Sequence, residues 1–206
     1  MLYLFLIALL LLPIAIIAGL AYAYKWLSRF YFLLLTISLI GIPLTAYKIY
    51  ERDFMLSVVP DALKVSSISY SEEDSWGFGP GGNEAGFRQY QLPEQISKQI
   101  TVSGIDFLKN MPPNKNQAKR DLRGVYSDWV ETPIKPGERW KPNKETGRFS
   151  IYDYICAYGV CIDIKPTVVE EANSIINDSG SYYAYGRNGL IIVSPNKNMV
   201  LYLYNG

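Results

Sequence analysis

The residues able to do chemistry in this 206-residue chain are limited by the absence of histidine. Histidine is the commonest general base and completes the Ser-His and Cys-His nucleophile arrangements. Ser194 and Lys197 fit a Ser-x-x-Lys pattern, but a proline lies between them and the segment is predicted to be a turn. Glu170 and Glu171 are adjacent on an expected helix and point in different directions. The sequence therefore favours a binding protein over an enzyme, with a membrane-bound hydrolase that uses carboxylates as an alternative.

The two cysteines, Cys156 and Cys161, are the next candidates for chemistry. Two cysteines without histidine make a zinc site improbable, and the spacing is not the Cys-x-x-Cys of a thiol oxidoreductase. Residues 151–156 and 161–165 resemble two strands, with a hairpin-sized loop at 157–160. We therefore predict a disulfide across two paired strands, in an oxidising compartment, and expect neither a metal nor a cofactor.

A glycine-rich loop at residues 75–86 is the most distinctive stretch of the second half of the chain. It matches Gly-x-Gly-x-x-Gly formally, but a strand follows where a dinucleotide site requires a helix, and acidic residues 72–74 would repel phosphate. We therefore expect no nucleotide. The loop is either a turn-rich connection or a recognition surface, since long loops often carry function. The candidate binding residues in it are Trp76, Phe78, Asn83 and Glu84.

Charge is unevenly distributed along the rest of the chain. Residues 51–108 hold nine acidic and four basic side chains, a net charge of −5, whereas residues 109–148 hold five acidic and ten basic ones, a net charge of +5. Residues 112–148 form a basic excursion, in which Arg120 and Arg123 are candidate contacts for an acidic partner or lipid headgroups. The alternative is that the two segments face each other or are solvated. The near-neutral total predicts no nucleic-acid partner.

The first 50 residues are predicted to be a helical hairpin in a membrane. Residues 2–24 carry no charge, and residues 30–50 contain a second uncharged run of 18 residues. At ~1.5 Å rise per residue, each helix is long enough for a hydrocarbon core of ~30 Å. Lys25 and Arg29 in the short connection place it in the cytoplasm by the positive-inside rule.

We accordingly predict a bacterial inner-membrane protein with both termini and the domain of residues 51–206 in the periplasm. Lys48 and Arg52, just after the second helix, favour the alternative of a cytoplasmic domain. A second alternative is a cleaved signal peptide, because Ala21-Tyr22-Ala23 resembles a cleavage site, although no basic region precedes the apolar run.

The 156 residues after the hairpin are enough for one domain. Strands are expected near 63–70 and 87–92, amphipathic helices at 93–110 and 166–178, and a three-strand meander at 182–185, 190–193 and 199–204. The expected fold is α+β, with an antiparallel sheet and two helices packed on one face.

The function that these patterns favour is binding rather than catalysis. We predict an accessory subunit of an envelope complex or an immunity-type protein, with membrane lipids and a protein in the membrane or periplasm as partners. A structural role of the hairpin, which would pack against another membrane subunit through Gly19 and Gly41, is a further alternative.

Overall fold

The computed structural model describes residues 2–76, 83–137, 140–159, 161–187 and 189–206, with the backbone alone for residues 2–10, 76 and 83. The chain forms two compact units, Met1–Asp53 and Phe54–Gly206. We describe each unit by itself.

The N-terminal unit is helical. Its elements are α1 (Leu2–Trp26), α2 (Arg29–Thr36), the π-helix η1 (Ile37–Gly41) and α3 (Ile42–Leu56), whose last residues belong to the second unit. The continuous stretch Arg29–Leu56 is 28 residues long and apolar enough to cross a membrane by length and composition. Its large apolar side chains are exposed rather than packed on the protein, as Leu33, Ile42 and Leu44 illustrate.

Proline explains the wider turn in the middle of this stretch. Pro43 has no N–H to donate to the carbonyl four residues earlier, so the regular α-helical ladder is interrupted there. The helix responds with the five-residue π-turn η1 directly before it, and continues as α3. Pro43 therefore modifies the helix without ending it.

The second unit is built on one antiparallel sheet of six strands, in the order β1-β2-β6-β5-β4-β3. The strands are β1 (Ile68–Trp76), β2 (Asn83–Gln91), β3 (Val130–Glu131), β4 (Tyr182–Tyr185), β5 (Leu190–Ser194) and β6 (Met199–Asn205). The meander at β4, β5 and β6 is confirmed. Its connection between β5 and β6 is the short 3₁₀ turn η3 (Pro195–Lys197), which ends at Asn198 in the left-handed conformation.

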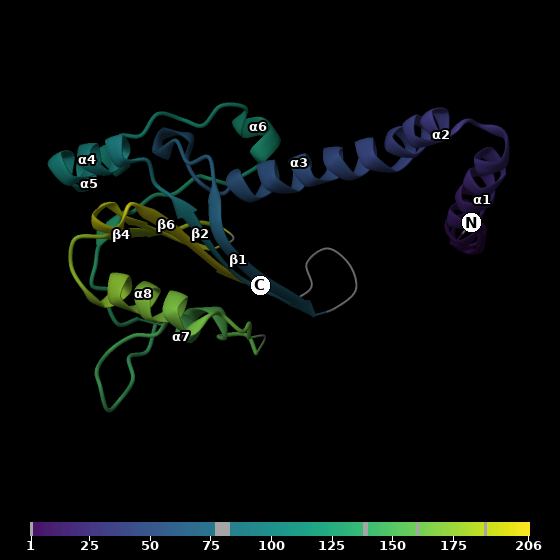
Figure 1. Cartoon of the computed structure of the whole chain (residues 1–206). Helices are drawn as coiled ribbons and strands as arrows, with labels where there is room; N and C mark the ends of the chain where they lie inside the picture. The colour runs from purple at the N-terminus through teal and green to yellow at the C-terminus, as the bar shows by residue number, and fades with distance from the viewer. Residues whose placement is uncertain (1, 77–82, 138–139, 160, 188) are drawn as a thin grey trace. The chain divides into compact units, whose positions relative to one another are not determined.

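Helices cover both faces of this sheet, so the expectation of two helices on one face is wrong. One face packs against α7 (Ile151–Ile155) and α8 (Pro166–Asn177), and we call it the α8 face. The other packs against α4 (Glu94–Ser103), α5 (Ile105–Lys109) and the 3₁₀ turn η2 (Asp61–Leu63), and we call it the α4 face. Figure 1 shows α4 and α5 on one side of the sheet and α7 and α8 on the other.

Successive side chains of the central strands point alternately into the two cores. On β5, Ile192 points to the α8 face, whereas Ile191 and Val193 point to the α4 face, and all three are fully buried. Period-two alternation between two apolar layers requires an uninterrupted apolar run, which is what β5 has. The apolar run is therefore the sequence signal for a strand covered on both faces.

Both ends of the predicted glycine-rich loop 75–86 belong to strands. Strands β1 and β2 are in register from Tyr70 opposite Gln89 to Trp76 opposite Asn83, so residues 75, 76 and 83–86 are strand rather than loop. Gly86 fits this longer hairpin because it has no side chain: a Cβ there would lie 2.1 Å from the ring of its cross-strand neighbour Tyr204.

The helix predicted at 93–110 is two helices. Gly104 has φ of +60°, a conformation that favours glycine, and it separates α4 from α5. The basic excursion carries the single helical turn α6 (Gln117–Arg120). Its Trp129 and Trp140 are both buried, so this excursion packs on the domain at both tryptophans.

The disulfide between Cys156 and Cys161 is present, with 4.6 Å between the Cα atoms, but the two paired strands predicted around it are wrong. Residues 151–155 form α7 because Ser150 and Asp153 make a capping box: Ser150 Oγ accepts from the Tyr152 amide, and Asp153 Oδ2 accepts from the Ser150 amide at 2.8 Å. Residues 161–165 have no regular secondary structure.

Candidate functional site

A cleft of about 690 Å³ opens on the α4 face, over the end of the sheet that α4 and α5 do not cover. We call it the arginine cleft, because Arg88, Arg123 and Arg187 line it. Its other lining residues come from the end of α3, the ends of β1, β2 and β6, and the chain terminus of the described structure; they are Phe54, Val58, Glu73, Asp74, Ser75, Glu84, Tyr202, Tyr204, Asn205 and Gly206.

The sheet register brings the floor of the cleft together. Tyr204 is opposite Gly86 and Tyr202 is opposite Arg88 in the β2–β6 pair, while Glu73 is opposite Gly86 in the β1–β2 pair. These side chains project from the same face because successive residues of a strand alternate. Three neighbouring strands therefore contribute to one polar floor.

A hydrogen-bonded cluster of Arg88, Glu73 and Tyr204 holds the side chains of this floor in place. The Arg88 guanidinium donates from Nη2 to Glu73 Oε2 at 2.5 Å and to the Tyr204 hydroxyl at 3.1 Å, and the Tyr204 hydroxyl donates to the same carboxylate oxygen at 2.6 Å. The Arg88 side chain is only 6% exposed, and its charge centre lies 5.0 Å from the centre of the Tyr204 ring. Such a closed set of charge-assisted hydrogen bonds holds its members in one arrangement.

The cluster also sets the ionisation of its members. Partial burial acts to raise the pKa of Glu73, but hydrogen bonds from Tyr204 and Arg88 and the charge of Arg88 outweigh it, so the pKa lies below its ordinary value. Burial raises the pKa of Tyr202 to about 12, although the charges of Arg88 and Arg123 act in the opposite direction. At neutral pH the floor therefore carries an ionised Glu73 and neutral tyrosines.

Arg123 reaches the cleft because its loop is tied to the segment that follows α3. The Tyr126 hydroxyl donates to the Val58 carbonyl at 2.8 Å, and Asn114 Nδ2 donates to the Gly124 carbonyl at 2.8 Å. Gly124 has φ of +73°, and a Cβ there would lie 2.9 Å from the Ser57 carbonyl. Held in this way, the Arg123 guanidinium stacks over the Phe54 ring at 4.4 Å.

The candidate residues from the sequence are only partly brought together. Glu84 and Arg123 line the arginine cleft. Arg120 does not, because it forms an ion pair with Asp61. The backbones of Trp76 and Asn83 are paired where β1 ends and β2 begins, and Phe78 lies outside the described residues.

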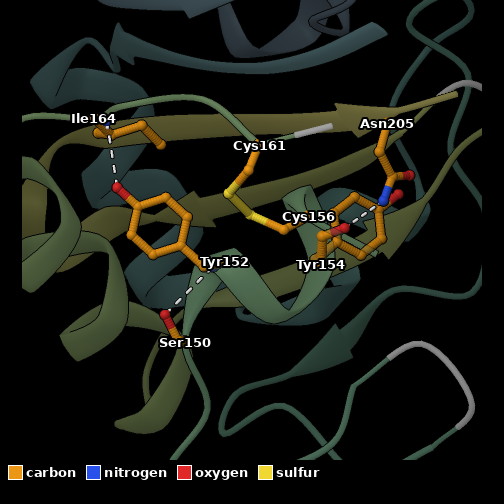
Figure 2. The surroundings of a disulfide bond; sticks show 7 residues. All are labelled: Ser150, Tyr152, Tyr154, Cys156, Cys161, Ile164 and Asn205. Carbon is orange, nitrogen blue, oxygen red and sulfur yellow. Dashed lines mark hydrogen bonds between the residues drawn. A yellow bond between two sulfur atoms is a disulfide. The ribbon is translucent and has the colours of Figure 1, made fainter. Parts of the chain in front are cut away.

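Other candidate groups have structural roles. Ser194 is buried and its hydroxyl accepts from Ser181 at 2.9 Å, whereas Lys197 is exposed on η3. The cysteine pair lies at the end of α7, under the opposite face of the sheet (Figure 2). There the Ile164 amide donates to the Tyr152 hydroxyl at 3.3 Å, and the Asn205 amide group donates to the Tyr154 carbonyl. Asn205, a residue of the cleft, is thus anchored on α7, directly before the segment 156–161 that the disulfide closes.

Sequence reasoning missed Arg88, Glu73 and both cleft tyrosines. One signal was available in the sequence: Arg88 lies inside the predicted strand 87–92, between Phe87 and Tyr90. Both of these residues are buried, and an arginine in such a strand is rarely buried without a partner. Comparison of the chain with protein-family models, curated proteins and solved structures found no match.

Proposed function

We propose that this chain is a membrane-anchored binding protein that displays its α+β domain outside the cytoplasm, as an accessory or immunity-type subunit, and binds a protein partner at the arginine cleft. The anchor is the helical hairpin of residues 1–50. Support for it comes from the length and apolarity of Arg29–Leu56 and from the exposure of its large apolar side chains, which need a non-aqueous surrounding.

The disulfide supports an extracytoplasmic location of the domain. Disulfides persist in oxidising environments such as the periplasm and are rare in the cytosol. Cys156 and Cys161 are paired, and the described residues contain no free cysteine. Together with Lys25 and Arg29 in the connection between the two helices, this favours an extracytoplasmic domain.

The composition of the arginine cleft carries the proposal. Arginine, tyrosine and other large aromatics are the residues that dominate binding energy at protein interfaces, whereas lysine, aspartate, glutamate and serine are depleted there. Among the described residues, the cleft is lined by three arginines, two tyrosines and one phenylalanine and by no lysine, and one of its three acidic residues, Glu73, is paired with Arg88. Its floor is held in place before any partner arrives, which lowers the entropic cost of binding.

The state of Glu73 argues against its use as a general acid in carboxylate catalysis. A carboxyl that acts as a general acid near neutral pH needs a raised pKa. The pKa of Glu73 is lowered, and the carboxylate is engaged by Arg88 and Tyr204. Its role in the cleft is therefore electrostatic and structural.

Site-specific photo-crosslinking in cells tests the proposal. A benzophenone amino acid replaces Ser75 on one side of the cleft, or Leu122 beside Arg123 on the other; both positions are exposed. The matched control is Val102 on α4, which is 88% exposed and does not line the cleft. We expect a protein adduct of the same discrete mass from both cleft positions and not from the control. Absence of an adduct from both cleft positions would overturn the proposal.

A further inference from the structure

Arg123 is a half-buried cation for which no described residue supplies a counter-charge. No carboxylate lies within ion-pair distance of it among the described residues, whereas Arg88 is paired with Glu73 and Arg120 with Asp61. Among the described residues, its Nε is buried without a hydrogen-bond partner, as is the Nε of Arg88, and its Nη2 makes only a long bond of 3.4 Å to the Lys119 carbonyl. Partly buried charges are normally paired, because water compensates them poorly. The Arg123 guanidinium is therefore available to pair with an anionic group of a partner.

Arg187 adds a second positive charge on the same side of the cleft. It and Arg123 both lie near Tyr202 and together line a small hollow next to the main cleft. Its ion pair with Asp121 is 3.4 Å long, and both side chains are more than half exposed. An exposed pair of this kind contributes little stability and exchanges easily for another carboxylate.

The opposite end of the cleft is negative. Glu84 is exposed at the beginning of β2, next to Asp74 and Ser75 of β1. It precedes Arg88 by four residues on the same strand, so the two backbone positions are about 13 Å apart at ~3.3 Å per residue. Tyr202, which lines the same small hollow as Arg123, is directly opposite Arg88. The cleft thus has a positive end and a negative end, separated by roughly four residues of extended chain.

Resting on the proposed function, we infer that the partner fills the arginine cleft with an extended segment that places a carboxylate on Arg123 and, about four residues away, a basic side chain beside Glu84. In an extended segment, residues i and i+4 project to the same side and span the required distance. A planar guanidinium suits a carboxylate, which it binds through two parallel hydrogen bonds. Glu73, Asp74 and Glu84 disfavour a purely anionic ligand such as a phosphate group.

A double-mutant cycle tests this inference on the full chain in detergent. The probe is a fluorescein-labelled peptide, Lys-Thr-Ser-Thr-Glu with blocked ends, and its variant has Gln in place of Glu. The protein variants are Arg123→Gln and, as the matched control, Arg148→Gln, an exposed arginine that does not line the cleft. Fluorescence anisotropy gives the four affinities of each cycle.

We expect Arg123→Gln to weaken binding of the Glu peptide about tenfold and to leave the Gln peptide nearly unchanged, as for a close charge pair. Arg148→Gln should affect neither peptide. Equal weakening of both peptides by Arg123→Gln, or no binding of the Glu peptide to the wild type, would overturn the inference. The inference would also be overturned, in favour of a phosphate ligand, if millimolar inorganic phosphate displaced the peptide from the wild type and did not displace it from Arg123→Gln. Crosslinks from Ser75 and Leu122 would still support the proposed function in each of these cases.

Discussion

Removing the carboxylate of Glu73 is expected to destabilise the domain measurably, because it leaves Arg88 charged and buried. Only 6% of the Arg88 side chain is exposed, and its guanidinium lies 2.5 Å from Glu73. Breaking a fully buried ion pair from one side costs ~3–5 kcal/mol. The Glu73 side chain is 49% exposed, so water can replace part of what is lost. We therefore expect about 2 kcal/mol for Glu73→Ala and about 1 kcal/mol for Glu73→Gln, which keeps an acceptor.

Urea unfolding of the full chain in detergent measures this effect, with the fluorescence of the buried Trp129 and Trp140 as the signal. Glu72→Ala is the matched control. It removes a neighbouring carboxylate whose only described hydrogen bond, from the Tyr70 hydroxyl, is 3.4 Å long. The control should change stability by less than about 0.5 kcal/mol. Equal effects of Glu73→Ala and Glu72→Ala would refute the reasoning.

The same variants give a pH test with a defined sign. The pKa of Glu73 is lowered in the folded state from an ordinary value of 4.5, so its ionised form stabilises the fold. This stabilisation is fully present above pH 4.5 and is lost as the pH falls through the lower, folded-state pKa. The stability difference between wild type and Glu73→Gln should therefore shrink below pH 4.5. A stability difference that stays constant below pH 4.5 would contradict the stabilising role of the ionised Glu73.

Three further predictions follow from the packing and the anchor. Replacing Cys156 and Cys161 by serine should lower stability by about 2 kcal/mol in the chain-entropy treatment of a six-residue loop, and an unchanged urea midpoint would contradict this. Gly86→Ala should displace the Tyr204 ring and destabilise the domain by about 1–3 kcal/mol, and a stability equal to wild type would show that the ring moves freely. When a reporter that works only outside the cytoplasm is fused after Gly206, it should be active. Activity of a cytoplasm-specific reporter at the same position would contradict the topology.

The elements that the sequence predicted well have strong local signals. Helix α8 begins with Pro166 at its first position and buries Ala172, Ile175 and Ile176 at helical spacing. The meander has turn residues at both corners, and Asn198 adopts the left-handed conformation expected of such a turn. In these segments local preference and tertiary packing agree.

The sequence interpretation failed where a short segment fits two structures. Residues 151–155 contain β-formers, but the Ser150 and Asp153 capping box and the burial of Ile151, Tyr154 and Ile155 favour one turn and a half of helix. The disulfide itself was predicted correctly, although the paired strands from which it was inferred do not form. The two-sided core was missed because the apolar run of β5 was interpreted as a meander strand with one covered face.

The arginine cleft could be predicted only in part, because its residues lie far apart in the sequence. Phe54, Glu73, Arg88, Arg123 and Tyr204 come from five segments, and only the sheet register and the loop contacts bring them together. Basic composition pointed to Arg123 without distinguishing it from Arg120, since a pairing with Asp61 over 59 residues has no local signal. Charge patterns thus indicated a contact surface, and the fold determined which side chains belong to it.

Chemical modification of arginine in intact membranes tests the central claim most directly. Phenylglyoxal labelling, read by mass spectrometry, compares Arg123 with the exposed Arg148 in the same molecule, first in membranes of the producing cell and then after purification. If a partner occupies the cleft, Arg123 should be labelled several-fold more slowly in membranes than in the purified chain, while Arg148 reacts equally in both. Equal labelling of Arg123 in the two preparations would contradict the account.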